Sequence, residues 1–387
     1  MILDIRRCCG RRARCACPRS RFPRSRRRRP PGRNAGCTSS TASGCSPHCW
    51  WPCTTARAPT GSIGPATRSG TVRCPRSCPR CSAYSTYGWI GVEIFFVISG
   101  FVICMSCWGR TPRPFFVSRV IRLYPAYWFA IAFTTAVVVA LPGVWERLRM
   151  RDILLNLTML QSGSASPHVD GVYWTLWTEL RFYLLFLVVV AMGLTYRRVV
   201  MFCCVWGTAA MLAPISELRL MILSVNPVAA WFFIAGLVLY LMYRFGQDLL
   251  LWGMLTMSWL MAQVELGRRI ESVEHVSGWR GSALIYTAFL LFMVAVALGH
   301  TDRIRWKWLV TAGALTYPLY LTHYPAGTVM INRLRDTMDP RLLVAVVIAV
   351  FLVLSLLVHR YVERLAARLL KRGLDTSFAR LRNATRG

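Results

Sequence analysis

Apolar runs of about 20 residues recur along most of this chain, and their length restricts the folds that it can adopt. A helix of that length crosses the hydrocarbon core of a bilayer. Hydrophobic residues occupy 55% of the 387 positions, more than a soluble domain needs. The sequence therefore predicts an all-α, polytopic transmembrane helix bundle. Its nine visible spans lie near residues 88–107, 116–141, 173–194, 198–214, 227–245, 248–265, 282–300, 308–331 and 341–360.

The first part of the chain breaks this pattern. Residues 1–83 hold 18 of the 47 basic residues, 11 of the 15 cysteines, one acidic residue and no apolar run that could span. Such a composition cannot bury a core, so we expect a disordered leader over residues 1–85. Residues 86–360 form the predicted membrane domain. Residues 361–387 form a basic tail, expected to be an amphipathic helix on the inner membrane surface.

Basic residues between the spans predict the orientation, because cytoplasmic loops carry most Lys and Arg. They follow the first, third, seventh and ninth spans, and include Arg110, Arg113, Arg197, Arg198, Arg303, Arg305, Lys307, Arg360 and Arg364. We therefore expect a multi-pass protein of the cell inner or plasma membrane with a cytoplasmic C-terminus. These loops and the leader account for the net charge of +31, so nucleic acid is not an expected partner.

This orientation requires one more span. Residue 88 must enter from outside, whereas the basic leader belongs inside, and nothing between them can cross. A shifted reading frame resolves the conflict, because from Ser40 to Thr55 the genetic code then permits DGLRLLAALLVALYH, an apolar helix with a His near its end. We expect such a shift upstream of the membrane domain. Resequencing codons 34 to 86 tests it, and reads that confirm the printed frame contradict it.

Two arginines lie inside the second apolar run. An ion in hydrocarbon is costly unless it is paired or hydrated, so such residues indicate a buried polar site. Arg119 and Arg122 are three residues apart and share a helix face at the predicted cytoplasmic end of the span. Two forked guanidinium groups there suit phosphates of a donor. The alternative is that they anchor the helix to lipid phosphates.

A carboxylate lies inside the third apolar run. Glu179 has Tyr183 one turn further along the same face. The carboxylate could orient a histidine, accept a sugar hydroxyl, or form a structural ion pair, for instance with Arg181. The block around Ser99 and Gly100 in the first span is typical of close helix packing rather than of a nucleophile.

Aromatic hydroxyls and a histidine recur in the eighth span. Tyr317, Tyr320 and His323 follow one another at three-residue spacing and share a face. His323 could transfer protons near neutral pH, or could simply bond to a neighbouring helix. His168 and Asp170, in the loop before the third span, could contact an acceptor or be solvated loop residues.

The cysteines of the spans carry no metal signature. Cys104 and Cys107, and the adjacent Cys203 and Cys204, lie in apolar helices without accompanying histidine clusters. The sequence also lacks a phosphate-binding glycine loop, a nucleophile elbow and a dinucleotide fingerprint. We therefore expect neither a metal nor a nucleotide cofactor of these classes.

Four blocks of the sequence resemble, in this order, the membrane-bound acyltransferase 3 family: YGWIGVEIFFVISGFVI, FFVSRVIRLYPAYW, VYWTLWTELRFYLLF and LTYPLYLTHYPAG. The resemblance covers about residues 86–360. It implies ten spans, O-acylation of saccharides, and an acyl-CoA donor, most often acetyl-CoA, with its phosphates near Arg119 and Arg122. The family's first span carries an Arg and, about ten residues later, an essential His. The shifted reading contains this pair and the printed sequence does not.

These features together predict an integral membrane O-acyltransferase. It would move an acyl group from cytoplasmic acyl-CoA to a hydroxyl of a cell-surface glycan, glycolipid or glycosylated metabolite. Glu179, Tyr183 and His323 are the predicted catalytic residues, and Arg119 and Arg122 the predicted donor-binding residues. The expected partners are a saccharide or glycolipid acceptor and the bilayer. One alternative is a membrane transporter, but the sequence shows no internal inverted repeat of the kind that many transporters have. The other alternative is an inactive family remnant that lacks the first-span His.

Overall fold

The computed structural model describes residues 87–164, 166–216, 218–272, 278–301, 303 and 306–384, and every regular element in these residues is helical. The α-helices are α2 (Ile90–Cys107), α3 (Pro112–Ala140), α4 (Met150–Asn156), α5 (Trp174–Ala191), α6 (Tyr196–Ser216), α7 (Arg219–Val225), α8 (Pro227–Phe245), α9 (Leu249–Ser272), α10 (Trp279–Ala297), α11 (Lys307–Leu334), α12 (Pro340–Leu357) and α13 (Arg364–Ala384). A 3-10 turn, η1 (Gly171–Tyr173), precedes α5, and a π-helical segment, η2 (Val358–Glu363), joins α12 to α13. The leader and the expected frame shift lie outside the described residues.

Eight helical stretches within the described residues are long and apolar enough to cross a membrane. They contain α2, α3, α5, α6, α8, α9, α10 and α12, and they coincide with eight of the nine predicted spans. The predicted span at 308–331 forms α11, which is long enough but is not among the eight. Threonine, tyrosine, histidine and two prolines along α11 make this helix less apolar. The predicted all-α membrane bundle is confirmed.

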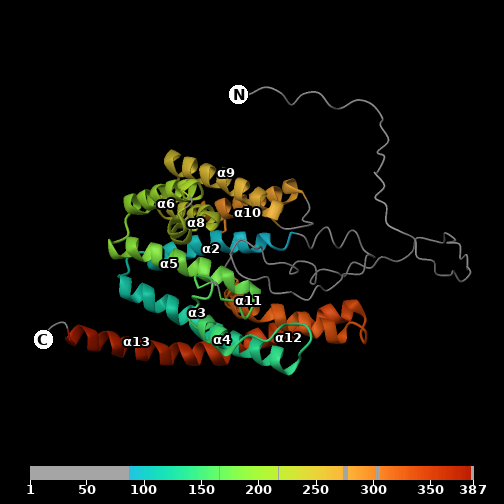
Figure 1. Ribbon diagram of the computed structural model, residues 1–387. Helices are drawn as coiled ribbons and strands as arrows, with labels where there is room; N and C mark the ends of the chain where they lie inside the picture. The colour runs from blue at the N-terminus through green and yellow to red at the C-terminus, as the bar shows by residue number, and fades with distance from the viewer. Residues whose placement is uncertain are drawn as a thin grey trace, which may run out of the picture. The chain divides into compact units, whose positions relative to one another are not determined.

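The bundle has two groups of helices with α5 between them (Figure 1). One group contains α2, α6, α8, α9 and α10, with α2 packed along α8; the other contains α3, α11, α12 and α13. Helix α13 continues from α12 through η2 and packs along α3, so the predicted tail helix forms. Its place on the inner membrane surface stays a prediction.

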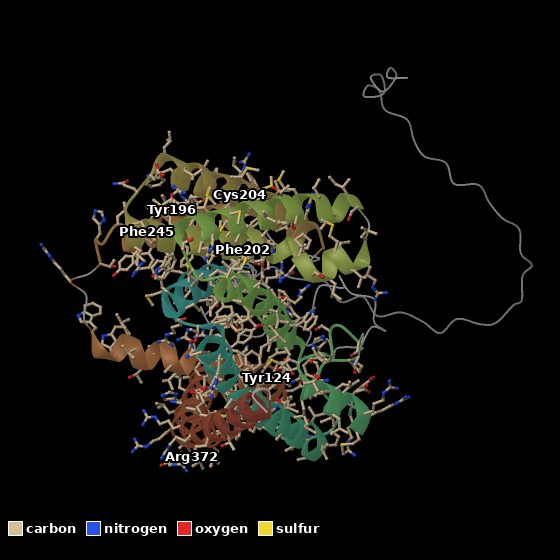
Figure 2. All side chains as sticks on the ribbon, turned by 90° about the vertical axis from the view of Figure 1, so that its left-hand side faces the viewer. Tyr124, Tyr196, Phe202, Cys204, Phe245 and Arg372 are labelled. Carbon is tan, nitrogen blue, oxygen red and sulfur yellow. The ribbon has the colours of Figure 1, made fainter. Side chains whose placement is uncertain are left out.

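The helices alternate in direction, which defines two ends of the bundle. At one end, which we call the Trp108 end, α2 and α8 both finish, and the Trp108 and Phe245 rings lie 5.3 Å apart. Helix α6 begins there, with the Tyr196 ring 5.5 Å from Phe245 (Figure 2). Helix α3 also begins at this end. At the opposite, Trp89 end, α2 and α5 begin and α9 finishes.

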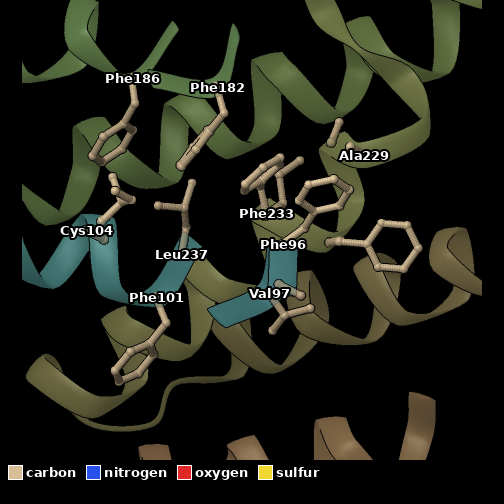
Figure 3. Close-up of a cluster of buried hydrophobic side chains, with 14 of the residues drawn as sticks. Phe96, Val97, Phe101, Cys104, Phe182, Phe186, Ala229, Phe233 and Leu237 are labelled. Atoms are coloured by element: carbon tan, nitrogen blue, oxygen red, sulfur yellow. The ribbon is translucent and has the colours of Figure 1, made fainter. Parts of the chain in front are cut away.

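Helix α8 is buried along most of its length and forms the centre of its group. Its Phe233 ring stacks on Phe182 of α5 at 4.2 Å and lies 4.9 Å from Phe96 of α2 (Figure 3). Gly100 of α2 and Gly236 of α8 let the two backbones touch, because a Cβ atom on either glycine would overlap the facing backbone. Gly100, the residue after Ser99, therefore allows α2 and α8 to pack closely, as predicted.

The stretch from Arg219 to Phe245 is interrupted between α7 and α8. Asn226 adopts a left-handed conformation with φ of 54°, and the following Pro227 has no amide hydrogen to donate. The break leaves carbonyl groups of α7 available to side chains. Trp206 Nε1 donates to the carbonyl of Val225 at 2.7 Å, and Arg181 Nη1 donates to the carbonyl of Leu223 at 2.9 Å.

Candidate active site

The Glu179 carboxylate is buried, with 5% of the residue exposed, where α2 and α5 meet. Its Oε1 atom accepts a hydrogen bond from Ser99 Oγ of α2 at 3.2 Å and another from the hydroxyl of Tyr183, one turn further along α5. Because both bonds go to Oε1, the second oxygen, Oε2, can accept a further partner. The suggested ion pair with Arg181 does not form, because Arg181 points to α7 and stacks over Trp177 at 5.5 Å.

Arg119 of α3 joins this group from the other side. Its guanidinium carbon lies 5.8 Å from the centre of the Tyr183 ring, and its Nη2 atom donates to Ser106 Oγ at 3.3 Å. Arg122, one turn further along α3, is more exposed. Both guanidinium groups interact electrostatically with the Glu179 carboxylate. The fold therefore brings Arg119, Tyr183 and Glu179 together from two helices that are distant in the sequence.

A shallow apolar groove lies between α3 and α5 beside this group. It is lined by Phe115, Phe116, Arg119, Val120, Leu123, Tyr124, Leu180, Tyr183, Leu184 and Leu187. Arg119 supplies the only charge in the lining, and the Tyr183 hydroxyl leads from it to Glu179. The groove can hold an extended apolar or amphipathic chain whose charged part lies at Arg119.

His323 of α11 lies beside Tyr320, one turn earlier on the same helix. Its Nδ1 atom lies 2.9 Å from the carbonyl of Tyr320 and 3.1 Å from that of Leu319, so Nδ1 carries the hydrogen and Nε2 is the nitrogen that can take up a proton. The Tyr320 ring lies 6.0 Å from the His323 ring, and Tyr320 interacts electrostatically with Glu179. Tyr317 donates to the carbonyl of Leu123 in α3 at 2.9 Å. Tyr317 and Tyr320 both interact electrostatically with Glu179, and His323 lies beside Tyr320.

The loop before α5 folds into the bundle instead of lying in solvent. Asp170 is buried, its Oδ1 atom caps η1 by accepting from the Val172 amide, and burial raises its pKa to about 8. His168 lies 3.2 Å through Nε2 from Ser162 Oγ, and burial lowers its pKa to about 4. Both side chains are therefore uncharged near pH 7, and the alternative that they are solvated loop residues is wrong.

The bundle also contains a buried ion pair that the sequence did not predict. Glu93 of α2 is 1% exposed and pairs with Arg269 of α9, whose guanidinium lies 4.8 Å from the Trp174 ring and 5.6 Å from the Trp89 ring. The signal that identified Glu179, a carboxylate within an apolar run, also applies to Glu93. Its partner lies 176 residues away, a pairing that no local pattern reveals.

Among the described residues, no group of three or more His, Cys, Asp or Glu side chains could hold a metal ion. Cys104, Cys107, Cys203 and Cys204 are all free thiols.

Comparisons with known proteins agree with this architecture. A family model of the acyltransferase 3 family, described as an acyltransferase domain, matches residues 71–360. A 113-residue segment is 36% identical to the exopolysaccharide production protein ExoZ of Rhizobium meliloti (strain 1021), covering 26% of this chain and 34% of that protein. The chain thus spans about a third of the length of that curated relative. No solved structure matches the chain.

Proposed function

Because the chain belongs to the acyltransferase 3 family, we propose that it moves an acyl group from acyl-CoA to a hydroxyl of a saccharide inside its helix bundle. The family match makes it an acyltransferase, and the apolar helices make it a multi-pass membrane protein. The donor, the acceptor and the residues that carry the reaction belong to the proposal. The observation that carries it is the contact of Arg119 with Tyr183, whose hydroxyl bonds to the buried Glu179.

In this proposal the donor binds from the Trp108 end. Arg119 and Arg122 hold phosphate groups of acyl-CoA through charge-assisted hydrogen bonds. The pantetheine arm then lies along the apolar groove between α3 and α5, and the thioester reaches further into the bundle. Acetyl is the proposed acyl group. The Trp108 end faces the cytoplasm of the cell inner or plasma membrane, because basic residues such as Arg110 and Arg197 concentrate there.

The reaction transfers the acyl group from the sulfur of CoA to a hydroxyl oxygen of the acceptor. The acceptor oxygen attacks the thioester carbonyl carbon, its proton passes to a base, the carbon–sulfur bond breaks, and the CoA thiolate leaves and takes up a proton. Glu179 Oε2 accepts the hydrogen bond of the acceptor hydroxyl, and Tyr183 and Ser99 hold the carboxylate in place. His323 relays the proton through Nε2.

The acceptor enters from the Trp89 end. The name of the Rhizobium meliloti relative concerns exopolysaccharide production, which supports a saccharide of the cell surface as the acceptor. Buried polar side chains near that end, among them Asp170 and Thr175, suit a hydroxyl-rich ligand better than an apolar one.

Radiolabelled acetyl-CoA tests the proposal in proteoliposomes that contain the purified chain and cell-surface polysaccharide extracted from its host. We expect label in the polysaccharide, released by mild base as an ester. Empty liposomes serve as the control. Uptake of solute without covalent label would instead support a transporter, and the absence of both would contradict an active enzyme.

A further inference from the structure

Five side chains form a compact cluster at the Trp89 end, which we call the Trp89 box: Trp89, Glu93, Trp174, Arg269 and Tyr286. They come from four helical segments: the start of α2, the start of α5, the end of α9, and α10. The box is separate from the Arg119–Tyr183–Glu179 group. None of its members has a role in the mechanism proposed above.

The charges of the box cancel one another. Arg269 pairs with Glu93 and lies between the faces of two indole rings, at 4.8 Å from Trp174 and 5.6 Å from Trp89. A buried pair of this kind is weak evidence for stability, because desolvation of two ions offsets most of their attraction. The pair does leave the site electrically neutral, so a negatively charged ligand would meet no net positive charge.

Three buried polar atoms of the box have no hydrogen-bond partner among the residues that the structure describes. They are Glu93 Oε2, the Tyr286 hydroxyl and Trp89 Nε1. Glu93 is 1% exposed and Tyr286 is fully buried, and the two interact electrostatically. Leaving such an atom buried and unpaired destabilises the fold, because the atom loses its hydrogen bonds to water. Three in one cluster therefore indicate a ligand that satisfies them.

The chemistry of these atoms matches a hydroxyl-bearing ring. The carboxylate oxygen only accepts, the indole nitrogen only donates, and the phenol does both. A sugar hydroxyl can donate to Glu93 while accepting from Trp89 or Tyr286. The aromatic rings beside these atoms offer flat apolar faces. Trp89 is half-buried, unlike Glu93 and Tyr286, so the box opens at this residue.

We propose that the Trp89 box is an acceptor subsite that binds a neutral hexose unit of a saccharide through its hydroxyl groups. This inference rests on the proposed function, because it names the place where the acceptor is held. Tyr320 connects the box to the reaction site, since it interacts electrostatically with Arg269 on one side and with Glu179 on the other. A sugar in the box can thus present the next unit of its chain toward Glu179.

The variant Tyr286→Phe tests the subsite most sharply. The substitution removes one hydroxyl and keeps the ring, so a purely structural role for Tyr286 predicts unchanged or higher thermal stability and unchanged ligand binding. A ligand-binding role predicts weaker binding without loss of stability. Tyr240→Phe is the matched control, because Tyr240 is also buried but lies at the Trp108 end, near Trp108 and Arg244.

The probes are a neutral hexose octasaccharide and an oligogalacturonide of equal length, with Kd measured by thermophoresis on the purified full chain. We expect only the neutral probe to bind. We also expect Tyr286→Phe and Trp89→Phe each to raise its Kd at least about threefold, as loss of one hydrogen bond predicts. Tyr240→Phe should leave the Kd unchanged. No binding of the neutral probe, equal binding of the uronate, or an unchanged Kd in Tyr286→Phe overturns the inference.

The two proposals fail in different ways. If the neutral probe binds and responds to Tyr286→Phe but labelled acetyl-CoA never transfers its acyl group, the subsite stands and the acyl-transfer function fails. If transfer occurs while neither Kd nor acceptor KM responds to Tyr286→Phe, the function stands and the subsite fails. The Kd for acetyl-CoA should be the same in Tyr286→Phe and in the unaltered chain.

Discussion

Each buried charge in the described bundle has a partner suited to its surroundings. Glu179 accepts from two hydroxyl groups, Glu93 pairs with Arg269, and Arg181 donates to the Leu223 carbonyl. The Glu179–Tyr183 bond could be predicted, because residues four apart on a helix face one another. The other three partners, Ser99, Arg269 and the Leu223 carbonyl, could not, since they join helices that are distant in the sequence.

Two buried loop residues give the folded state a defined pH dependence. Asp170, with its pKa raised to about 8 from 3.8, keeps its proton in the folded state over a range where the unfolded chain loses it. Raising the pH through this range therefore lowers the free energy of unfolding, by up to about 1.4 kcal/mol per pH unit. His168, with its pKa lowered to about 4 from 6.5, acts in the opposite direction between those values.

The two effects oppose each other between pH 4 and 6.5, and Asp170 acts alone from 6.5 to 8. We expect the unfolding midpoint in detergent to change little in the first range and to fall in the second. Asp170→Asn, which keeps the cap of η1, should remove the fall and leave a rise between pH 4 and 6.5. Asp336→Asn, an exposed control, should follow the unaltered chain. Parallel profiles for Asp170→Asn and the unaltered chain would contradict the burial of Asp170.

At the scale of the helices, span positions followed from the sequence because the signal is local. A run of bilayer length must form its hydrogen bonds within itself, so it becomes a helix whatever it packs against. The structure therefore agrees with eight predicted spans to within a few residues at most ends. The π-helical segment after α12 and the short α4 carry no comparable signal, whereas the break between α7 and α8 falls at Asn226 and Pro227, a pair that interrupts helices.

The close approach of α2 and α8 yields a stability prediction. Gly236→Ala would place a methyl group against the carbonyl of Val97 and the amide of Phe101, so the two helices must separate. We expect a loss of roughly 1–3 kcal/mol, the usual cost of overpacking, measured as a lower unfolding midpoint. Gly253→Ala on α9 is the control, because nothing lies near its added methyl group. It should be neutral or stabilising by roughly 0.5–1 kcal/mol. Equal midpoints for the two variants would refute the close contact.

At the scale of the whole molecule, the candidate site lies where the two helix groups meet. Helix α5 stands between them and contributes Glu179 and Tyr183, while α3 contributes Arg119 and α2 contributes Ser99 (Figure 1). The sequence identified Glu179, Tyr183 and Arg119 as charged or aromatic residues in apolar runs, and Ser99 as part of a packing block. It could not show that they converge, because convergence depends on how α3 packs against α5. The first 86 residues lie outside the part of the chain that the structure describes.

Separate measurements of donor binding and acyl transfer test the central claim most directly. The Kd for acetyl-CoA is measured by calorimetry, and acyl transfer is measured as label on the saccharide. Both are measured for the unaltered chain, Arg119→Ala, Glu179→Gln and the exposed control Arg110→Ala. We expect Arg119→Ala to raise Kd by about tenfold or more, the loss of one charge-assisted hydrogen bond. Glu179→Gln should keep Kd within about twofold and slow transfer by about 10²-fold or more. Arg110→Ala should change neither. Donor affinity and transfer that are unchanged in both site variants would contradict a reaction centre formed by Arg119, Tyr183 and Glu179.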